Sequence, residues 1–482
     1  MPLWSKSATE LAAAVRAGDV SALDVIDSHL DRIAEVNPRL NAVTQLLADR
    51  ARDAARHTDR RRAAGGELGP LAGVPFTVKE CTPIAGVPTT FGTPHLRDHV
   101  AAADAVPVAR LRAAGAIPIG HSNMPTLILS GMHTVSELYG DTRNPWDPSR
   151  TPGGSSGGDG VAVAAGMAPL GLGNDSGGSV RIPAAFCGVA ALKPTTGRFP
   201  ADQRLIGPDD PGPASQVLVT DGPLARTVAD LRLAYETLSG PDPRDPRAVP
   251  VPLYGGPVPL RGGPPSAEPH DGPLRVAVVA DPGGLGIHPT VRRAVETAAD
   301  ALRAAGYDVR DVPDVPRLDE ALDVYHRLAV TEFAPNWPAV QRLLGAGGER
   351  YIELTMRSTP PADAAGLIRL MSAWMNIRRS WTEFLHHHPL LLGPVFTEPP
   401  VEPGLESRDQ EGRDRVATAM RLCSVTSFVG VPAVAVPTGL AADGLPTGVQ
   451  IVGRAFREDL CLAAAQAVED RLGVLTPVDP RP

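Results

Sequence analysis

The sequence predicts an α/β protein in which helices and strands pack in layers. Apolar runs typical of strands alternate with helical patterns in the first half of the chain, and the alternation resumes after residue 273. The chain has 482 residues, of which 43% are hydrophobic and 21% charged. Such a chain can bury a large core and exceeds the size of one ordinary domain.

Residues 7–63 are expected to form N-terminal helices. Ser7 and Ser21 each precede apolar residues at helical spacing, where a serine side chain can cap the free amides of a first helical turn. The stretch 51–62 is polar and rich in arginine, so it is expected to form the solvated face of a helix.

The segment 64–238 begins with alternating elements and contains a region rich in glycine and serine. Residues 71–78 are a strand candidate, 106–114 a helix and 117–120 a short strand. We expect this segment to hold the catalytic core, because Lys79 and the two serine-bearing glycine turns described below lie in it.

Residues 239–273 are rich in proline and glycine and are expected to connect two halves of the chain. In the second half, 274–482, the sequence predicts a strand at 274–279, a helix at 289–305 and a mostly helical segment at 315–390. Aromatic residues of that last segment are candidates to line a pocket, although core packing explains each of them as well. They are Tyr325, Phe333, Trp337, Trp374, Trp381 and Phe384.

Two glycine-rich turns that carry serines lie between Thr151 and Arg198. The first, at 153–158, reads GGSSGG, and the second, at 175–179, reads DSGGS. Glycines let backbone amides approach a ligand closely, and a serine beside such amides can offer a nucleophile next to an oxyanion site, as acyl transfer requires. The apolar run between the turns disfavours a flexible linker, and the lack of a GxxxxGK[ST] pattern there disfavours phosphate binding. Catalysis is the favoured interpretation, and it requires a base.

Lys79, at the end of an apolar run, is the candidate base. The chain contains three lysines, Lys6, Lys79 and Lys193, so most of its cationic side chains are arginines. A lysine shifts its pKa readily when buried, whereas arginine stays protonated. A lone strand-end lysine usually keeps its ammonium group in water; the glycine-serine turns downstream favour the catalytic interpretation.

The chain resembles the amidase signature family, whose members use a Ser–cis-Ser–Lys triad. The similarity covers most of the chain, and its motifs follow one another in the family's order. They are GVPFTVK at 73–79, NPWD at 144–147 leading into the first glycine turn, GNDSGGSVR at 173–181, LKPT at 192–195, GPLARTVAD at 222–230, GVPA at 430–433 and GLPTGVQ at 444–450. The resemblance implies a single amidase domain over residues 1–482, with a large mixed, twisted β-sheet flanked by helices on both faces.

Matched by position, the resemblance implies that Ser179 is the nucleophile, Ser155 the cis-serine and Lys79 the base. It also implies a cis peptide bond before Ser155 and a bracing role for Asp175 and Arg181 in the nucleophile loop. The oxyanion would be held by the backbone amides of Ser176, Gly177, Gly178 and Ser179, with Ser155 beside the bound substrate.

Several details resemble the fatty-acid-amide-hydrolase branch of the family. They are Lys79-Glu80-Cys81, Thr151-Pro152 before the first glycine turn, and His121-Ser122-Asn123-Met124-Pro125. Ile128 matches a position that contacts substrate in that branch. One departure is Asn174, since the family usually has threonine before the aspartate of the nucleophile loop, and this substitution bears on the geometry of the oxyanion site.

The resemblance therefore implies a serine hydrolase that cleaves carboxylic amides, not peptides, through an acyl-enzyme on Ser179. The apolar residues Leu127, Ile128 and Leu129 suggest an apolar or aromatic acyl group. One alternative is the amidase subunit of a tRNA-dependent amidotransferase. Another is a catalytically idle family member that acts as a binding protein, although the intact Lys79, Ser155 and Ser179 disfavour it.

Composition narrows the expected partners and location. A net charge of −8 disfavours nucleic acid and anionic membranes as partners. No stretch resembles a signal peptide, a membrane anchor or a spanning helix, so a cytoplasmic location is expected. The expected partner is a small-molecule amide, and dimers are common in the family, so a homodimer is a further expectation.

No cofactor or metal is expected. The four cysteines (Cys81, Cys187, Cys423 and Cys461) are scattered and are expected to be reduced core thiols. His386-His387-His388 is a poor metal site, because adjacent histidines do not share a face of a helix or strand. No GxSxG sequence is present to support a Ser-His-Asp triad.

Overall fold

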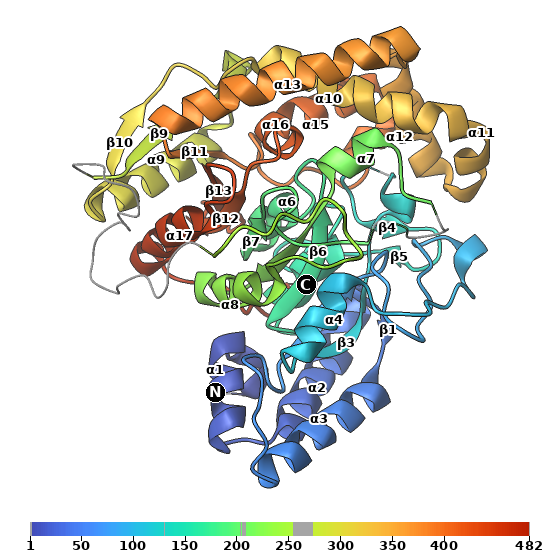
Figure 1. Cartoon of the computed structure of the whole chain (residues 1–482), viewed down its shortest axis with the longest axis vertical. Coiled ribbons are helices and arrows are strands. Elements are labelled where there is room, and N and C mark those ends of the chain that lie inside the picture. Colours follow the sequence, from blue (N-terminus) through green and yellow to red (C-terminus); the bar gives the residue numbers. More distant parts are fainter. Residues whose placement is uncertain (1, 130, 203, 205–208, 254–272, 482) are drawn as a thin grey trace.

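The computed structural model describes residues 2–129, 131–202, 204, 209–253 and 273–481 (Figure 1). In this part of the chain, eleven strands form one sheet that runs through the middle of the molecule. In spatial order they are β1 (Val43–Leu46), β3 (Ile117–Ser122), β2 (Pro75–Lys79), β6 (Leu170–Asp175), β8 (Thr220–Ala225), β7 (Ala190–Lys193), β12 (Ala433–Leu440), β13 (Pro446–Gly453), β11 (Leu390–Pro394), β9 (Arg275–Val278) and β10 (Asp308–Asp311). A separate small ribbon pairs β4 (Val135–Ser136) with β5 (Gly140–Asp141).

The sheet is mixed, as expected. Strand β2 runs parallel to both β3 and β6, and β9 runs parallel to β10 and β11. Strands β6, β8, β7, β12, β13 and β11 are joined by antiparallel pairs. Because β7 of the first half pairs with β12 of the second, both halves of the chain complete the same sheet.

The N-terminal helices begin where their caps predict. Ser7 and Ser21 cap α1 (Ala8–Ala17) and α2 (Ala22–Leu40), and each forms a reciprocal capping box with an acidic residue three positions later. The arginine-rich stretch lies in α3 (Ala48–Ala63), which buries only two alanines. The purely helical expectation for 7–63 missed edge strand β1, whose four residues carry too short a pattern to signal a strand.

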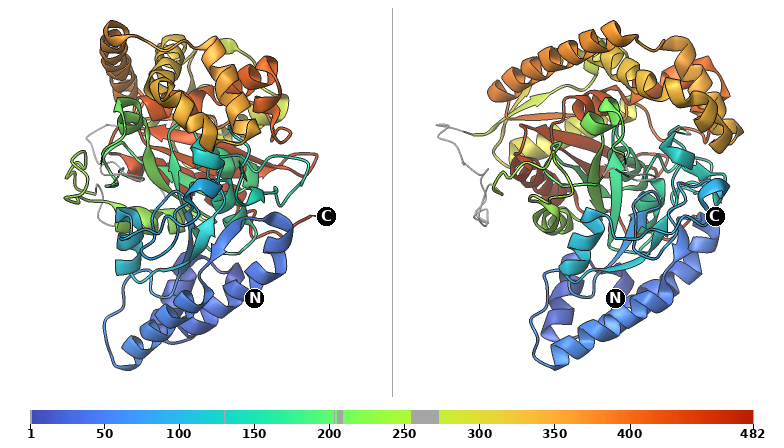
Figure 2. Two further views of the ribbon diagram at one scale, coloured as in Figure 1. Left: turned by 90° about the vertical axis from the view of Figure 1, so that its right-hand side faces the viewer. Right: turned by 45° about the vertical axis from the view of Figure 1, so that its right-hand side comes forward.

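Helices cover both sides of the sheet (Figures 1 and 2). Those that follow α3 in the first half are α4 (Val106–Ala113), α5 (Gly157–Ala164), α6 (Arg181–Cys187), α7 (Pro213–Leu218) and α8 (Val228–Leu238). Those in the second half are α9 (Pro289–Ala304), α10 (Leu318–Phe333), α11 (Trp337–Val340), α12 (Ala346–Ser358), α13 (Ala364–His387), α14 (Leu405–Arg408), α15 (Gln410–Ala419), α16 (Arg421–Phe428) and α17 (Glu458–Leu472). The expected helical segment 315–390 is thus confirmed, and in Figure 1 it lies at the opposite end of the molecule from α1–α3.

Most predicted elements appear with small shifts. The strand predicted at 71–78 begins later, at Pro75, and ends at Lys79, because residues 69–74 form turns held by hydrogen bonds to the end of α4. Strand β9 and helix α9 agree with their predictions within a residue or two. The predicted connection 239–273 lies partly outside the described residues, and its described part, 239–253, contains no helix or strand.

Two fully buried helices, α5 and α6, lie at the centre of the core. Every residue of α5 and α6 is buried, and these helices contact each other, while α5 also packs on β6 and α6 on β12 and β13. Because α5 consists of glycine, alanine and valine residues besides Asp159, its short side chains let it approach β6 and α6 closely. No helix in the described part of the chain has the length and apolar character needed to cross a membrane.

Candidate active site

Lys79 is the last residue of β2, and all five residues of this strand are buried. The strand lies between two parallel neighbours, and Lys79 stands beside Ser122 at the end of β3. The carboxyl ends of parallel strands are the usual edge for binding sites in α/β sheets. The strand thus places a fully buried amine at an edge suited to a site.

The Lys79 amine has two close partners. Nζ lies 2.6 Å from Ser155 Oγ and 2.6 Å from Asn174 Oδ1. Burial lowers the pKa of Lys79, because it disfavours the charged ammonium, and the nearby carboxylates oppose that effect without reversing it. A neutral amine can donate to the amide oxygen of Asn174 and accept a proton from the Ser155 hydroxyl.

The turn that carries Ser155 is closely packed against its surroundings. The Gly154–Ser155 peptide bond is cis, as the resemblance implied. A Cβ on Gly158 would lie 2.4 Å from the backbone nitrogen of Asn123, so only glycine fits there. The Ser156 amide donates to the Ser179 carbonyl at 3.0 Å, which joins the two serine-bearing turns.

An ion pair buried behind the second turn holds the loop of Ser179. Arg181 donates two hydrogen bonds to the Asp175 carboxylate, and Asp175 also accepts the amides of Gly178 and Val180. Burial acts to raise the pKa of Asp175, but the Arg181 charge and these hydrogen bonds outweigh it and hold the pKa far below its usual value. Arg181 also bonds residues of α16, so the pair ties the loop to the second half of the chain.

The backbone amides of this loop are not equivalent. Gly178 N–H was expected to face an oxyanion, but it donates to Asp175 Oδ1 at 2.8 Å and is engaged in bracing the loop. The amides of Ser176, Gly177 and Ser179 have no protein acceptor among the described residues. These three remain available to a bound ligand.

Two further carboxyl groups lie near Lys79, of which Asp159 is buried and Asp221 is half-buried. Burial raises the pKa of Asp159 to about 7. The Thr77 hydroxyl, which donates to Asp159 Oδ1 at 2.7 Å, acts in the opposite direction and lowers this pKa. Burial likewise raises the pKa of Asp221 to about 7, against the attraction of Lys79. Burial therefore disfavours the charged form of both carboxyl groups as well as that of Lys79.

A small apolar cluster adjoins this site. Buried Cys81, Phe91 and Met124 pack with Leu96, Leu127 and Ile128, which are partly buried. Asn174 Nδ2 donates to Cys81 Sγ at 3.2 Å, so Asn174 links this cluster to the Lys79 amine. Ile128 thus belongs to an apolar cluster that Asn174 connects to the Lys79 amine.

The aromatic residues of 315–390 have different roles. Trp374 and Trp381 donate their indole N–H groups to the carbonyls of Phe428 and Pro316 and pack in the core. Tyr325 on α10 reaches the loop of Ser179, since a Cβ on Gly177 would lie 2.4 Å from the Tyr325 hydroxyl. Sequence reasoning named Tyr325 only among six aromatics, because nothing local marks the contact.

Asn174 and Glu406 hold parts of the site in place, and the sequence alone did not predict this role for either of them. Asn174 was noted as a departure from the family pattern but not as a partner of Lys79. Glu406 of α14 is buried and accepts the amides of Met132 and His133, in the loop that follows the apolar stretch around Ile128. Within the described residues, no group of three or more His, Cys, Asp and Glu side chains is arranged to hold a metal ion.

Comparison with known proteins agrees with this geometry. A family model described as Amidase matches residues 24–462. The chain belongs to the amidase family. An indoleacetamide hydrolase of Bradyrhizobium diazoefficiens is 40% identical over 98% of this chain and 88% of its own length.

Two further relatives cover nearly the whole chain. A glutamyl-tRNA(Gln) amidotransferase subunit from Salinispora tropica is 35% identical over 98% of this chain and 99% of its own. The crystal structure of a bacterial aryl acylamidase of the amidase signature family superposes with a TM-score of 0.84 at 27% identity, covering 98% of this chain and 97% of that one. The protein is an amide-hydrolysing enzyme of this family.

Proposed function

We propose that this amidase is a serine hydrolase that cleaves a small carboxylic amide with an apolar or aromatic acyl group through an acyl-enzyme on Ser179. The observation that carries the proposal is the 2.6 Å contact between the buried Lys79 amine and Ser155, whose turn is bonded directly to that of Ser179. Both observations support a relay in which Ser155 passes a proton from Ser179 to Lys79.

The first step forms the nucleophile. Neutral Lys79 takes the proton of Ser155, and Ser155 takes the proton of Ser179, so that Ser179 Oγ attacks the amide carbonyl carbon. The negative charge that develops on the carbonyl oxygen is stabilised by the amides of Ser176, Gly177 and Ser179. Gly178 contributes by holding the loop through Asp175.

The second step breaks the C–N bond. The proton on Lys79 returns through Ser155 to the leaving nitrogen, which departs as ammonia or an amine and leaves an ester on Ser179. Water then attacks this ester by the same proton path, releases the carboxylic acid and restores the hydroxyl of Ser179. Burial supports the path because it favours the neutral form of Lys79.

The apolar cluster around Cys81 and Ile128 supports an apolar acyl group. An acyl chain that enters beside Ser179 would exchange water for these side chains, which favours binding of hydrophobic groups. The names of the relatives, indoleacetamide hydrolase and aryl acylamidase, point to aryl-containing amides. We therefore place primary amides of arylacetic acids first among candidate substrates.

A fluorophosphonate probe tests the nucleophile. We expect the wild-type chain to be labelled and mass mapping to place the label on Ser179, while a Ser179→Ala variant stays unlabelled. A label on Ser155, Ser156 or a cysteine would contradict the assignment. Failure of the pure, folded wild type to react would favour an idle binding protein.

The substrate class is tested by measuring hydrolysis of three amides: indole-3-acetamide, a long-chain fatty acid amide and L-glutamine. We expect the aryl amide to give the highest kcat/KM. The alternative, one component of a tRNA-dependent amidotransferase, is favoured by the 35% identical relatives of that name. It would be supported by selective use of glutamine that requires added partner subunits.

A further inference from the structure

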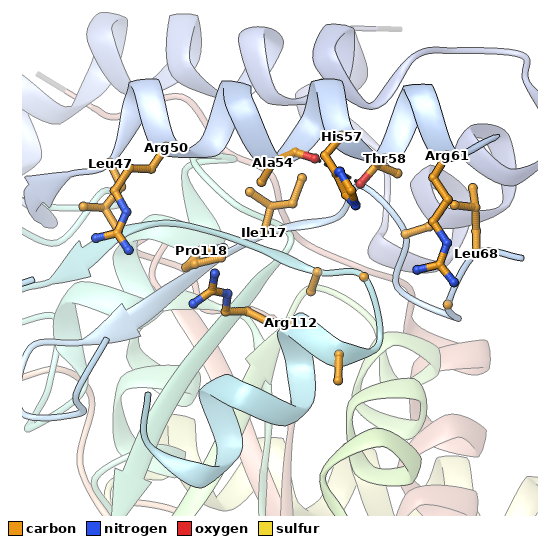
Figure 3. Close-up of a pocket in the computed structure, with 15 residues that line it drawn as sticks. Leu47, Arg50, Ala54, His57, Thr58, Arg61, Leu68, Arg112, Ile117 and Pro118 are labelled. Atoms are coloured by element: carbon orange, nitrogen blue, oxygen red, sulfur yellow. Dashed lines mark hydrogen bonds between the residues drawn. The ribbon is translucent and has the colours of Figure 1, made fainter. Parts of the chain in front are cut away.

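A separate cavity lies under the N-terminal helix α3, and among the described residues it shares no lining residue with the candidate active site (Figure 3). Its volume is about 480 Å³, within the range of sites that hold small organic ligands. Helix α3 forms one side, and the start of β3 with the end of α4 forms the other. Ile117 and Pro118 of β3 line it, whereas Lys79 stands beside Ser122 at the other end of that strand, about 16 Å away at the usual rise per residue.

The charged side chains of this cavity are all basic. Arg50, Arg61 and Arg112 line it together with His57, and no aspartate or glutamate is among its lining residues. Such a concentration of cationic groups contrasts with the net charge of −8 for the whole chain. A site of this kind attracts anions. We call it the basic cavity.

Two of the guanidinium groups are held in place by the protein. Arg50 Nη2 donates to the Ala85 carbonyl at 2.8 Å, and Arg112 Nη1 donates to Asp104 Oδ2 at 2.6 Å. Asp104 also accepts the Ala85 amide at 2.8 Å, so the groups that hold the two arginines are bonded to each other although they lie 19 residues apart in the chain. Asp104 balances one positive charge, and each guanidinium keeps further N–H groups with which to bind an anion.

Apolar side chains form another part of the wall of the basic cavity, and backbone hydrogen bonds hold this part in place. Leu47, Ala54, Leu68, Ala72 and Ile117 contribute carbon surface. The backbone wall is fixed because the amides of Leu71 and Gly73 donate to the carbonyls of Ala114 and Gly115 at 2.9 and 3.0 Å. A ligand that fits both kinds of surface carries an anionic group and an apolar body.

We propose that the basic cavity binds an organic anion, namely a carboxylate attached to an apolar or aromatic group. Arg50 and Arg112 receive the carboxylate, because their partners Ala85 and Asp104 are bonded to each other and both guanidinium groups lie toward the same end of the view in Figure 3. The apolar body lies along Ala54 and Ile117. This site is separate from the catalytic one and does not depend on the chemistry at Ser179.

The test is a calorimetric titration of the full-length enzyme with 2-naphthoate, at low and high salt. We expect saturable binding that weakens with added salt, because the arginines are partly exposed to screening ions. A double variant, Arg50→Gln with Arg112→Gln, is expected to weaken binding by about tenfold or more. Arg56→Gln is the matched control, since Arg56 lies on the same helix, pairs with Asp53 and does not line the cavity.

The double variant and the Arg56→Gln control both keep the catalytic site, so any 2-naphthoate bound there contributes equally to both titrations. A difference between the two titrations therefore reports on the basic cavity. Neutral 2-naphthalenemethanol lacks the anionic group and inorganic phosphate lacks the apolar body, so both are expected to bind much more weakly than 2-naphthoate. The proposal is overturned if 2-naphthoate shows no saturable binding at millimolar concentration. It is equally overturned if the double variant binds like the Arg56→Gln control, or if phosphate binds as tightly as 2-naphthoate.

Discussion

Replacing Asn174 by aspartate tests the proposed role of neutral Lys79 most directly. Asn174 Oδ1 lies 2.6 Å from Lys79 Nζ, so Asn174→Asp places a carboxylate oxygen next to the amine with little change of shape. A carboxylate there stabilises the ammonium form and raises the pKa of Lys79, opposite to the effect of burial. Since only the neutral amine can accept a proton, the pH at which activity is lost on acidification moves upward.

The size of the effect follows from the short contact. At an effective dielectric constant of about 20, two unit charges 2.6 Å apart attract by roughly 6 kcal/mol, an upper bound that the cost of burying a new carboxylate reduces. Opposite charges at close range commonly shift a pKa by about 1–3 units, or roughly 1.4–4 kcal/mol. On the sloping acid limb, this shift corresponds to an activity loss of about 10- to 1000-fold at constant pH.

The assay is the pH profile of kcat/KM for the best amide substrate. Asn174→Thr is the control, because threonine is the usual family residue and adds no charge; we expect its acid limb to stay near that of the wild type. Thermal unfolding of both variants checks that the fold is intact. An Asn174→Asp profile that coincides with the wild type would refute the reasoning, because the charge of Lys79 would then not limit the reaction.

Three further predictions concern the same site. Lys79→Arg should reduce kcat by about 10²- to 10⁴-fold, nearly as much as Lys79→Ala, because arginine cannot accept the proton; near-normal turnover by the arginine variant would make Lys79 a structural cation. Ser155→Ala should retain more activity than Ser179→Ala in initial-rate assays, since water can replace a relay but not a nucleophile; the reverse order would exchange their roles. Arg181→Met should lower the free energy of unfolding by about 3–5 kcal/mol in urea titrations, because it leaves the Asp175 carboxylate buried without its partner; Ser179→Ala is the control, and an equal, small change in both would contradict the bracing role.

The parts of the fold that the sequence predicted well are those set by interactions between residues close together in the chain. The capping serines Ser7 and Ser21 determine where α1 and α2 begin, because a cap acts within one helical turn. Strand β1 was missed because its four residues carry too little periodic pattern. The start of the strand that bears Lys79 was placed too early, because the turns before it are held by distant backbone groups at the end of α4.

The candidate site likewise has features that could be predicted from the sequence and features that could not. The glycine-rich turns and the rare lysine are local signals that pointed to this region and to Lys79, and the family resemblance singled out Ser155 and Ser179 within the turns. The structure brings Lys79 and Ser155 together and joins the two serine turns. The engagement of Gly178 by Asp175 was not predicted, although the two are three residues apart, because a sequence does not show which way a backbone amide points.

Local patterns in the sequence were enough to predict the layered α/β class, the helix starts and the residues capable of the chemistry. Which side chains meet depends on the tertiary packing, which brings Asn174 to Lys79 and Cys81, and Tyr325 to the Gly177 backbone. This packing likewise places Glu406 on the Met132 amide, 274 residues away along the chain. Secondary structure follows from interactions within a few residues, whereas these contacts depend on how the sheet and its helices pack, and no spacing in the sequence encodes that packing.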